Sequence, residues 1–284
     1  MTFADLLLLA AAAVWGTTFV VVKAGLRDVS PLLFVAVRFT AAAALVAPVV
    51  FWRRGRPTAF AWRAGIAAGV PLLVGFALQT VGLQWTPPGR AAFLTGLYVV
   101  FVPLLAPLLG ARRADARTWA AVVLALAGTA ALTRPAEGGA MAFGPGELCM
   151  VGCALAFAVQ ILAVDRVAGA LPPWTLLATE LCAVTGASWP AALALESPRL
   201  RPSPTALGAL AALVLLASVG ALWVQNWAQR RVPPSRTAVI FALEPAFAAV
   251  TSWFVTGERL TGWGMAGGGA ILVAMAVCGR GGRT

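Results

Sequence analysis

A single glutamate lies inside a strongly apolar stretch and is followed directly by a proline. The stretch reads AVIFALEPAF (residues 238–247), and Glu244 is its only charged residue. A carboxylate in such surroundings can bind an amino or hydroxyl group of a ligand, or it can carry a proton. Pro245 has no backbone N–H, so the carbonyl of Phe241, one turn earlier, loses its helical partner. This pattern indicates ligand binding or proton transfer; the alternative is a structural acid hydrogen-bonded to the backbone beside the kink.

The composition of the whole chain places this stretch in a membrane. Of 284 residues, 61% are hydrophobic and 11% are charged, and the mean hydropathy is +0.88. The apolar stretches do not alternate as barrel strands do, so we predict an all-α membrane protein. A helix needs about 20 residues to cross a hydrocarbon core of roughly 30 Å. Ten transmembrane helices are expected, over residues 4–25, 31–52, 63–84, 90–110, 117–133, 146–165, 173–195, 205–228, 234–256 and 262–279.

Glu244 is predicted to lie near the middle of its span. A helix from Pro234 to Phe254 puts it ten residues from either end, or roughly 15 Å deep at about 1.5 Å per residue. A charged carboxylate facing lipid at that depth costs several kcal/mol. We therefore expect Glu244 to face the interior of the helix bundle.

Two halves of the chain are related by an internal repeat. TPPGRAAFLTGLYVVF (86–101) aligns with VPPSRTAVIFALEPAF (232–247) at an offset of 146 residues. This offset pairs Tyr98, the only tyrosine, with Glu244, so a phenol and a carboxyl occupy related points. Earlier in the halves, an offset of 142 residues applies. It pairs Asp5 with Glu147, Trp15 with Phe157, Thr18 with Gln160, and Arg38 with Glu180.

Each half contains five predicted spans, so the second half must enter the membrane in the opposite orientation. We predict two inverted five-helix repeats, residues 1–135 and 146–284, joined by a Gly- and Pro-rich connector at 136–145 within one integral membrane unit. An inverted repeat of this kind places a cavity where the halves meet.

The basic residues give the expected orientation. With the amino terminus in the cytoplasm, thirteen Lys and Arg residues lie on the cytoplasmic side and seven on the opposite side. Both termini are therefore predicted to be cytoplasmic. The net charge of +11 is then a topology signal, and no nucleic-acid partner is expected.

Several kinds of chemistry are disfavoured by the residues the chain lacks. It has no histidine, no phosphate-binding loop and a single lysine, Lys23, so neither histidine-based catalysis nor ATP hydrolysis is expected. All four cysteines fall in predicted spans without a cluster of other ligands, so no metal site is predicted. We expect no cofactor and no enzymatic activity; a membrane-embedded enzyme is the less favoured alternative.

Three stretches resemble a known family. AVWGTTFVVVKAG, PPGRAAFLTGLYVVFVPLLAPLL and ALEPAFAAVTSWFVTGERLTGWGMAGGGAILVAM are similar to the EamA family of the drug/metabolite transporter superfamily. The resemblance implies a ten-helix inner-membrane carrier. Its central cavity is formed by the first, third and fourth helices and their counterparts, the sixth, eighth and ninth. Members move amino acids and related metabolites, often outward.

Polar and aromatic residues of those helices are the candidate substrate-binding residues. For the amides, helix–helix hydrogen bonding is an equal alternative, and for the aromatic residues it is packing. Arg38 and Glu180 are expected to form a structural pair or to extend separately toward the interface, with a gating or dimer contact as the alternative. The candidates are Trp15, Thr18, Gln79, Thr95, Tyr98, Phe157, Gln160, Trp223, Asn226, Phe241 and Glu244.

The function expected is that of a secondary transporter. It moves small amphipathic metabolites across the bacterial inner membrane by alternating access, and amino-acid export is the leading expectation. An importer or facilitator of nucleosides, sugars or organic cations is the alternative. The expected partners are a small-molecule substrate and the lipid bilayer, and the chain acts as a monomer or a homodimer.

Overall fold

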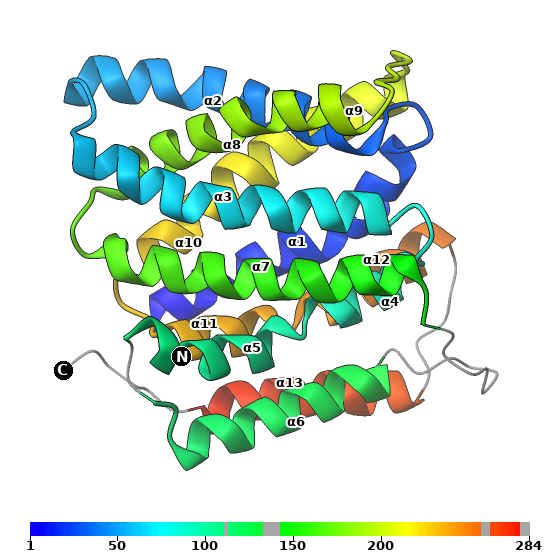
Figure 1. Ribbon diagram of the computed structural model, residues 1–284. Helices are drawn as coiled ribbons and strands as arrows, with labels where there is room; N and C mark the ends of the chain where they lie inside the picture. The colour runs from blue at the N-terminus through cyan, green and yellow to red at the C-terminus, as the bar shows by residue number, and fades with distance from the viewer. Residues whose placement is uncertain (111–112, 133–142, 257–261, 279–284) are drawn as a thin grey trace.

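The computed structural model describes residues 1–110, 113–132, 143–256 and 262–278. Within these ranges every regular element is a helix (Figure 1), apart from one isolated bridge between Val29 and Leu200. The helices are α1 (Phe3–Gly25), α2 (Pro31–Arg54), α3 (Ala59–Gly82), α4 (Pro88–Thr95), α5 (Tyr98–Leu105), η1 (Pro107–Leu109), α6 (Ala116–Leu132), α7 (Pro145–Ala168), α8 (Pro173–Leu195), α9 (Pro204–Ala212), the π-helical η2 (Leu213–Ala221), α10 (Leu222–Ala228), α11 (Pro234–Phe241), α12 (Glu244–Thr256) and α13 (Gly262–Val277).

Some predicted features fall outside the described residues. Most of the connector at 136–145 does, and so does the Gly257–Leu260 part of the stretch that resembles the EamA family. The charge asymmetry also includes basic residues there: Arg112, Arg134, Arg259, Arg280 and Arg283.

Seven helical segments of the described ranges are long and apolar enough to cross a membrane, judged by length and composition. Two shorter apolar helices, within α6 and α13, accompany them, and α11 is separated from α12 by a break. The prediction of an all-helical, multi-pass membrane protein is thereby confirmed. Ten spans and an inverted repeat stay predictions. The seven segments are Phe3–Gly25, Pro31–Arg54, Ala59–Gly82, Pro88–Leu105, Pro145–Ala168, Pro173–Leu195 and Pro204–Ala228.

Two helical segments are broken at positions 146 residues apart. The first break separates α4 from α5 at Gly96–Leu97, and the second separates α11 from α12 at Ala242–Leu243. In both, the first turn residue donates its N–H to the carbonyl four residues back at 3.0 Å, and the second donates to the carbonyl three residues back at 3.2 Å. Pro245 has no N–H to donate to the carbonyl of Phe241, the last residue of α11. The first break has Val99 at the equivalent position, so a break of this form does not require a proline.

The two breaks also lie next to each other in space. A Cβ built on Gly96 would lie 3.8 Å from Cγ of Pro245. The ends of α4 and α11 and the starts of α5 and α12 therefore lie close together in the bundle, although the two breaks are far apart in the sequence.

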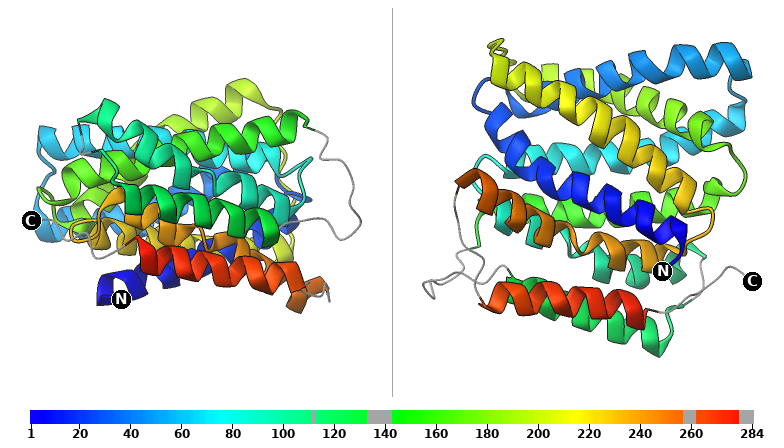
Figure 2. Two further views of the ribbon diagram at one scale, coloured as in Figure 1. Left: turned by 90° about the horizontal axis from the view of Figure 1, so that it is seen from below. Right: turned by 180° about the vertical axis from the view of Figure 1, so that it is seen from behind.

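The helices pack mainly across the two halves of the chain. α2 packs against α8 and α6 packs against α13, the latter pair along one edge (Figure 1). α3 packs on α7, and α1 lies between the Pro204–Ala228 segment and the α11–α12 segment (Figure 2). α4 and α5 pack on α7 as α11 and α12 pack on α1. Cores formed by these contacts surround the centre of the bundle.

Glycines let α3 approach α8 closely. A Cβ on Gly65 would lie 2.5 Å from Cβ of Thr179, and one on Gly69 would lie 2.9 Å from the backbone oxygen of Glu180. The spacing of four residues puts both glycines on one face. Small residues are the usual solution where two membrane helices must pack backbone to backbone.

Each end of the bundle carries an ion pair between the two halves. Arg236, at the start of α11, binds Asp5 of α1 through Nε to Oδ1 at 3.0 Å and Nη2 to Oδ2 at 2.9 Å. Arg90, at the start of α4, lies 3.4 Å from Glu147 of α7. Lys23 near the end of α1 donates to the carbonyls of Leu83 and Thr86, in the connection between α3 and α4. The second pair is therefore at the opposite end of α1 from the first.

Each acid of these pairs also caps its own helix. Asp5 is the third residue of α1 and accepts from the backbone N–H of Thr2 at 2.7 Å. Glu147 is the third residue of α7 and accepts from the backbone N–H of Gly144 at 2.9 Å. A carboxylate at this position pairs with helix N–H groups that lack a partner in the first turn. The two acids therefore have the same two roles in the two halves.

Candidate functional site

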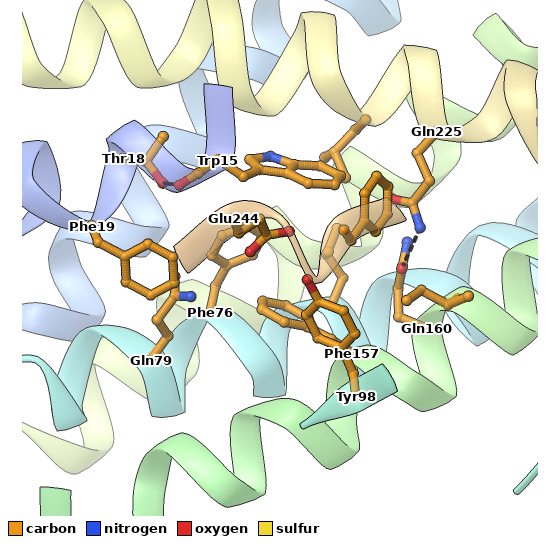
Figure 3. A pocket seen from close by; sticks show the side chains of 14 residues that line it. Trp15, Thr18, Phe19, Phe76, Gln79, Tyr98, Phe157, Gln160, Gln225 and Glu244 are labelled. Atoms are coloured by element: carbon orange, nitrogen blue, oxygen red, sulfur yellow. Dashed lines mark hydrogen bonds between the residues drawn. The ribbon is translucent and has the colours of Figure 1, made fainter. Parts of the chain in front are cut away.

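A cavity lies at the centre of the bundle, where α1, α3 and α7 meet the two breaks (Figure 3). It encloses about 440 Å³ of unfilled space, part of which is open to the outside. Tyr98 and Glu244 are the first residues after the two breaks, so both point from helix ends into the cavity. The lining residues are Trp15, Thr18, Phe19, Leu72, Phe76, Gln79, Tyr98, Phe157, Gln160, Ile161, Leu222, Gln225, Phe241 and Glu244.

Eight of the eleven candidate residues line this cavity, and three do not. Thr95 is buried against α7, with its hydroxyl 3.7 Å from the sulfur of Met150. Trp223 packs against Trp174 with ring centroids 5.3 Å apart. Asn226 is buried one layer behind the cavity wall. The eight that line it are Trp15, Thr18, Gln79, Tyr98, Phe157, Gln160, Phe241 and Glu244.

The cavity residues absent from the candidate set could have been found from helical spacing. Phe76 and Leu72 lie three and seven residues before Gln79, which is the periodicity of one helix face. The offset of 146 residues pairs Gln225 with Gln79, so the choice of Gln79 as a candidate already pointed to Gln225. Phe19, Ile161 and Leu222 are also three or four residues from a candidate, but their apolar side chains gave no chemical reason to select them.

Aromatic rings form much of the wall. Trp15 meets Phe241 edge to face, with centroids 5.0 Å apart and an interplanar angle of 77°. Phe76 and Phe157 form a second edge-to-face pair at 5.1 Å. Gly75 makes room for the Phe157 ring, because a Cβ there would overlap it. The wall therefore presents apolar faces of the rings to whatever enters.

Some polar groups of the wall are already satisfied within the protein. The indole N–H of Trp15 donates to the carbonyl of Ala217 at 3.2 Å, in the π-helical η2. The hydroxyl of Thr18 donates to the carbonyl of Trp15 at 2.6 Å. These two residues offer a ring and a methyl group to the cavity, and their hydrogen-bonding groups hold the helices together.

Three other polar groups of the wall are buried and have no such partner. Glu244, Tyr98 and Gln79 are 5%, 2% and 6% exposed. The Tyr98 hydroxyl points toward the Glu244 carboxylate (Figure 3) but forms no hydrogen bond of ordinary geometry. Within the described part of the chain, neither the Glu244 carboxylate nor the Gln79 amide is hydrogen-bonded. The backbone bond expected for a purely structural Glu244 is therefore not formed.

A chain of amides leads from the wall to a second buried carboxylate. Gln160 and Gln225 line the cavity, and Nε2 of Gln225 donates to Oε1 of Gln160 at 2.9 Å. Nε2 of Gln160 donates to Oε1 of Glu180 at 3.0 Å. Nδ2 of Asn226 donates to the other oxygen, Oε2, at 3.1 Å. Glu180 is thus separated from the cavity by one glutamine side chain.

Arg38 and Glu180 do not behave as expected. Within the described residues no ion pair joins them, and both are buried, so neither extends to an interface. Arg38 donates from Nε to the hydroxyl of Ser218 at 2.7 Å and lies over the ring of Phe76, 4.5 Å from its centroid. The prediction of a pair was wrong because tertiary packing gave each charge separate partners.

The sequence model of the EamA-like transporter family matches the chain over residues 2–134 and 144–280. The chain belongs to the EamA-like transporter family. Two uncharacterized transporters of Archaeoglobus fulgidus are similar to it. One is 31% identical over 275 residues, covering 97% of this chain and 85% of the relative. The other is 28% identical over 266 residues, covering 89% of each.

A solved crystal structure has the same fold as this EamA-like transporter. The two superpose with a TM-score of 0.79 over 96% of this chain and 95% of the other, at 23% sequence identity. At that identity the likeness concerns the fold alone. Family membership, in turn, makes the chain a transporter without specifying a substrate.

Proposed function

We propose that this EamA-like transporter is a secondary carrier of small amphipathic metabolites that exports amino acids. The observation that carries the proposal is the set of three polar groups that face one cavity: the Glu244 carboxylate, the Tyr98 hydroxyl directed toward it, and the Gln79 amide. A buried polar group without a partner costs about 1–3 kcal/mol, and more when it is charged. The cavity therefore favours a ligand that pairs with these groups.

An amino acid matches the chemistry of the wall. Its ammonium group pairs with a carboxylate and accepts cation–π contact from aromatic rings. The Tyr98 hydroxyl and the Gln79 amide can both donate to the substrate's carboxylate oxygens. The rings of Trp15, Phe76 and Phe157 offer an apolar surface to a side chain, and few of these contacts depend on its shape. We expect broad selectivity among amino acids of moderate size.

Alternating access between inverted repeats is the proposed mechanism. Three observations support it: the two breaks 146 residues apart, the reciprocal packing of the halves, and the two ion pairs at opposite ends. The family model also matches two segments that meet at the predicted junction. We propose ten spans that place the central cavity between the two ends, each end closed in turn.

The proposed location is the bacterial inner membrane, with both termini in the cytoplasm. The excess of Lys and Arg, thirteen against seven, supports this orientation. It puts the Asp5–Arg236 pair on the cytoplasmic side and the Arg90–Glu147 pair on the other.

Counterflow into liposomes tests the proposal. Purified protein is reconstituted, and a panel of amino acids, nucleosides, sugars and organic cations is assayed for exchange. Amino acids should exchange, and Glu244→Gln should lower their transport at least tenfold or change its pH dependence, because the charge that pairs with the ammonium group is lost. Unchanged transport and an unchanged pH profile in a folded Glu244→Gln protein would remove Glu244 from the site.

Thr95→Val is the matched control. Thr95 is a buried polar residue next to the break of the other segment, α4–α5, but it lies outside the cavity, so its replacement should leave exchange unaltered. Organic cations are the second candidate substrates, because the carboxylate is surrounded by aromatic rings as in cation-binding cages. Exchange of organic cations without amino acids would favour that class.

A further inference from the structure

Glu180 is a buried acidic residue that forms no ion pair within the described residues. Its side chain is fully buried on α8, and it accepts hydrogen bonds from the amides of Gln160 and Asn226 only. An isolated carboxylate in a low-dielectric interior is costly, and natural proteins avoid the cost by pairing it, by binding a cation or by protonating it.

The charged groups on the neighbouring helices are directed elsewhere. α8 packs against α2, α3 and α10, and α7 supplies Gln160. Arg38 of α2 binds Ser218, and α10 carries no titratable residue. On α7, Cys153 lies against Thr95 and Glu147 pairs with Arg90. No ion pair to Glu180 is formed within the described ranges. The remaining titratable residues of these helices are Arg53, Arg54, Arg63, Cys149, Asp165, Arg166 and, on α8 itself, Cys182.

We propose that Glu180 is a proton-binding site of the carrier, distinct from Glu244. A metal cation such as Na⁺ would need several oxygen ligands. Both oxygens of Glu180 face amide N–H groups instead, so the surroundings do not suit a metal cation. A proton needs only one acceptor next to the carboxyl group. That acceptor is Asn226.

The direction of the amide chain identifies Asn226 as the acceptor. Gln229 donates to the carbonyl of Ile161 at 2.8 Å, which leaves its side-chain oxygen to accept from Gln225. Gln225 also donates to Gln160, so Gln160 must present its N–H to Glu180. Gln160 is therefore a donor in either protonation state, because reversing it would break the bond to Gln225.

Asn226 has no such constraint. Its Oδ1 is buried without a hydrogen-bond partner, while its Nδ2 donates to Glu180. Rotating the amide by half a turn exchanges the two atoms, so that Oδ1 accepts the O–H of a protonated Glu180. Before the rotation the Oδ1 atom of Asn226 lacks a partner, and after it the Nδ2 atom does, so the rotation leaves the number of unpartnered atoms unchanged. Asn226 thus suits the carboxylate in one orientation and the carboxylic acid in the other.

The site is connected to substrate through Gln160, which lines the cavity and covers Glu180. A proton enters or leaves when Gln160 moves aside, and the position of Gln160 in turn shapes the cavity wall. Proton occupancy and substrate occupancy are therefore linked through one side chain. This link rests on the proposed carrier function, whereas proton binding by Glu180 does not.

Infrared difference spectroscopy of the full chain in lipid nanodiscs, without substrate, tests the proton site. On titration, the Glu244→Gln protein, which lacks the carboxyl group of the cavity, should show the C=O band of a buried carboxylic acid, and adding Glu180→Gln should remove it. Glu147→Gln, at an acid that is paired with Arg90, should leave the band in place. Asn226→Leu should keep the band but move it to higher wavenumber, because the O–H loses its amide acceptor.

The absence of a titrating band in the Glu244→Gln protein, or a band that persists when Glu180→Gln is added, would overturn the proton site. An unmoved band in Asn226→Leu would overturn the role of Asn226.

A transport experiment tests the coupling separately. In liposomes with a pH gradient, the wild type should accumulate leucine, phenylalanine or threonine above the equilibrium level, and Glu180→Gln should lose accumulation while retaining counterflow. Gradient-driven accumulation by Glu180→Gln would show that coupling lies elsewhere. If the wild type fails in counterflow while the infrared band titrates, the proposed substrate class fails and the proton site does not.

Discussion

Glu244 and Tyr98 occupy equivalent positions of the two halves, each as the first residue after a helix break. A carboxylate and a phenol at one cavity are chemically unequal although the backbone around them is alike. This inequality gives the cavity a polarity that a symmetric site would lack. For the proposed amino-acid substrate, we therefore expect one preferred orientation, with the ammonium group at Glu244.

Tyr98→Phe isolates the contribution of the phenol at this scale. The hydroxyl has no hydrogen-bond partner in the protein, so removing it should not lower the melting temperature. If it binds substrate, KM for the exchanged amino acid should rise up to about tenfold, the equivalent of about 1.4 kcal/mol and one hydrogen bond. Unchanged KM with unchanged stability would assign Tyr98 to packing alone.

The helical elements are shaped by small residues and by irregular hydrogen bonding. The indole N–H of Trp15 donates to a backbone carbonyl of the π-helical η2. On the next residue, Gly16, a Cβ would lie 2.5 Å from the backbone oxygen of Glu244. α1 is thus held close to η2 on one side and to the start of α12 on the other. The position of the Glu244 backbone depends on these contacts.

Close packing of α3 on α8 gives a prediction for the elements. Gly69→Ala should lower stability by about 1–3 kcal/mol, because its Cβ would meet a backbone oxygen and the Cβ of Ala183 at 3.0 Å. Gly186→Ala on α8 is the control, since nothing lies within 4 Å of its Cβ. Thermal unfolding in detergent measures both. Equal melting temperatures would show that α3 and α8 can separate without loss.

At the scale of the whole molecule, the two ion pairs differ in tightness. The Arg236 and Asp5 side chains are 10% and 1% exposed, whereas those of Arg90 and Glu147 are 25% and 10% exposed and meet at a longer distance. A buried bidentate pair resists separation more than a partly solvated one does. The structure is therefore closed more firmly at the Asp5 end.

Neutralising either pair should shift the balance between the two ends. Asp5→Asn should raise amide hydrogen exchange at the starts of α1 and α11 and lower it at the starts of α4 and α7. Glu147→Gln should do the reverse, because opening one end closes the other in the alternating-access mechanism that we propose. Raised exchange at both ends in both variants would indicate plain destabilisation. The exchanged pair, Asp5→Arg with Arg236→Asp, serves as the control for charge.

The sequence by itself determined that the chain is a helical membrane protein, since only helices satisfy the backbone of such apolar stretches in lipid. It also identified Glu244, Tyr98 and Gln79, because polar residues are rare in spans and each stands out. The repeat offset paired Tyr98 with Glu244, but the helix breaks that precede them were not predicted, since both spans were expected to be continuous.

Only the tertiary structure decided which polar groups are free and which are already bound. Trp15 and Thr18 read as donors in the sequence, but the carbonyls that accept from them are fixed by packing and by local backbone geometry. Arg38 and Glu180 read as a pair, yet each found other partners. Hydrogen bonding acts over about 3 Å, so a helix rotation too small to alter any hydrophobic pattern settles which groups meet.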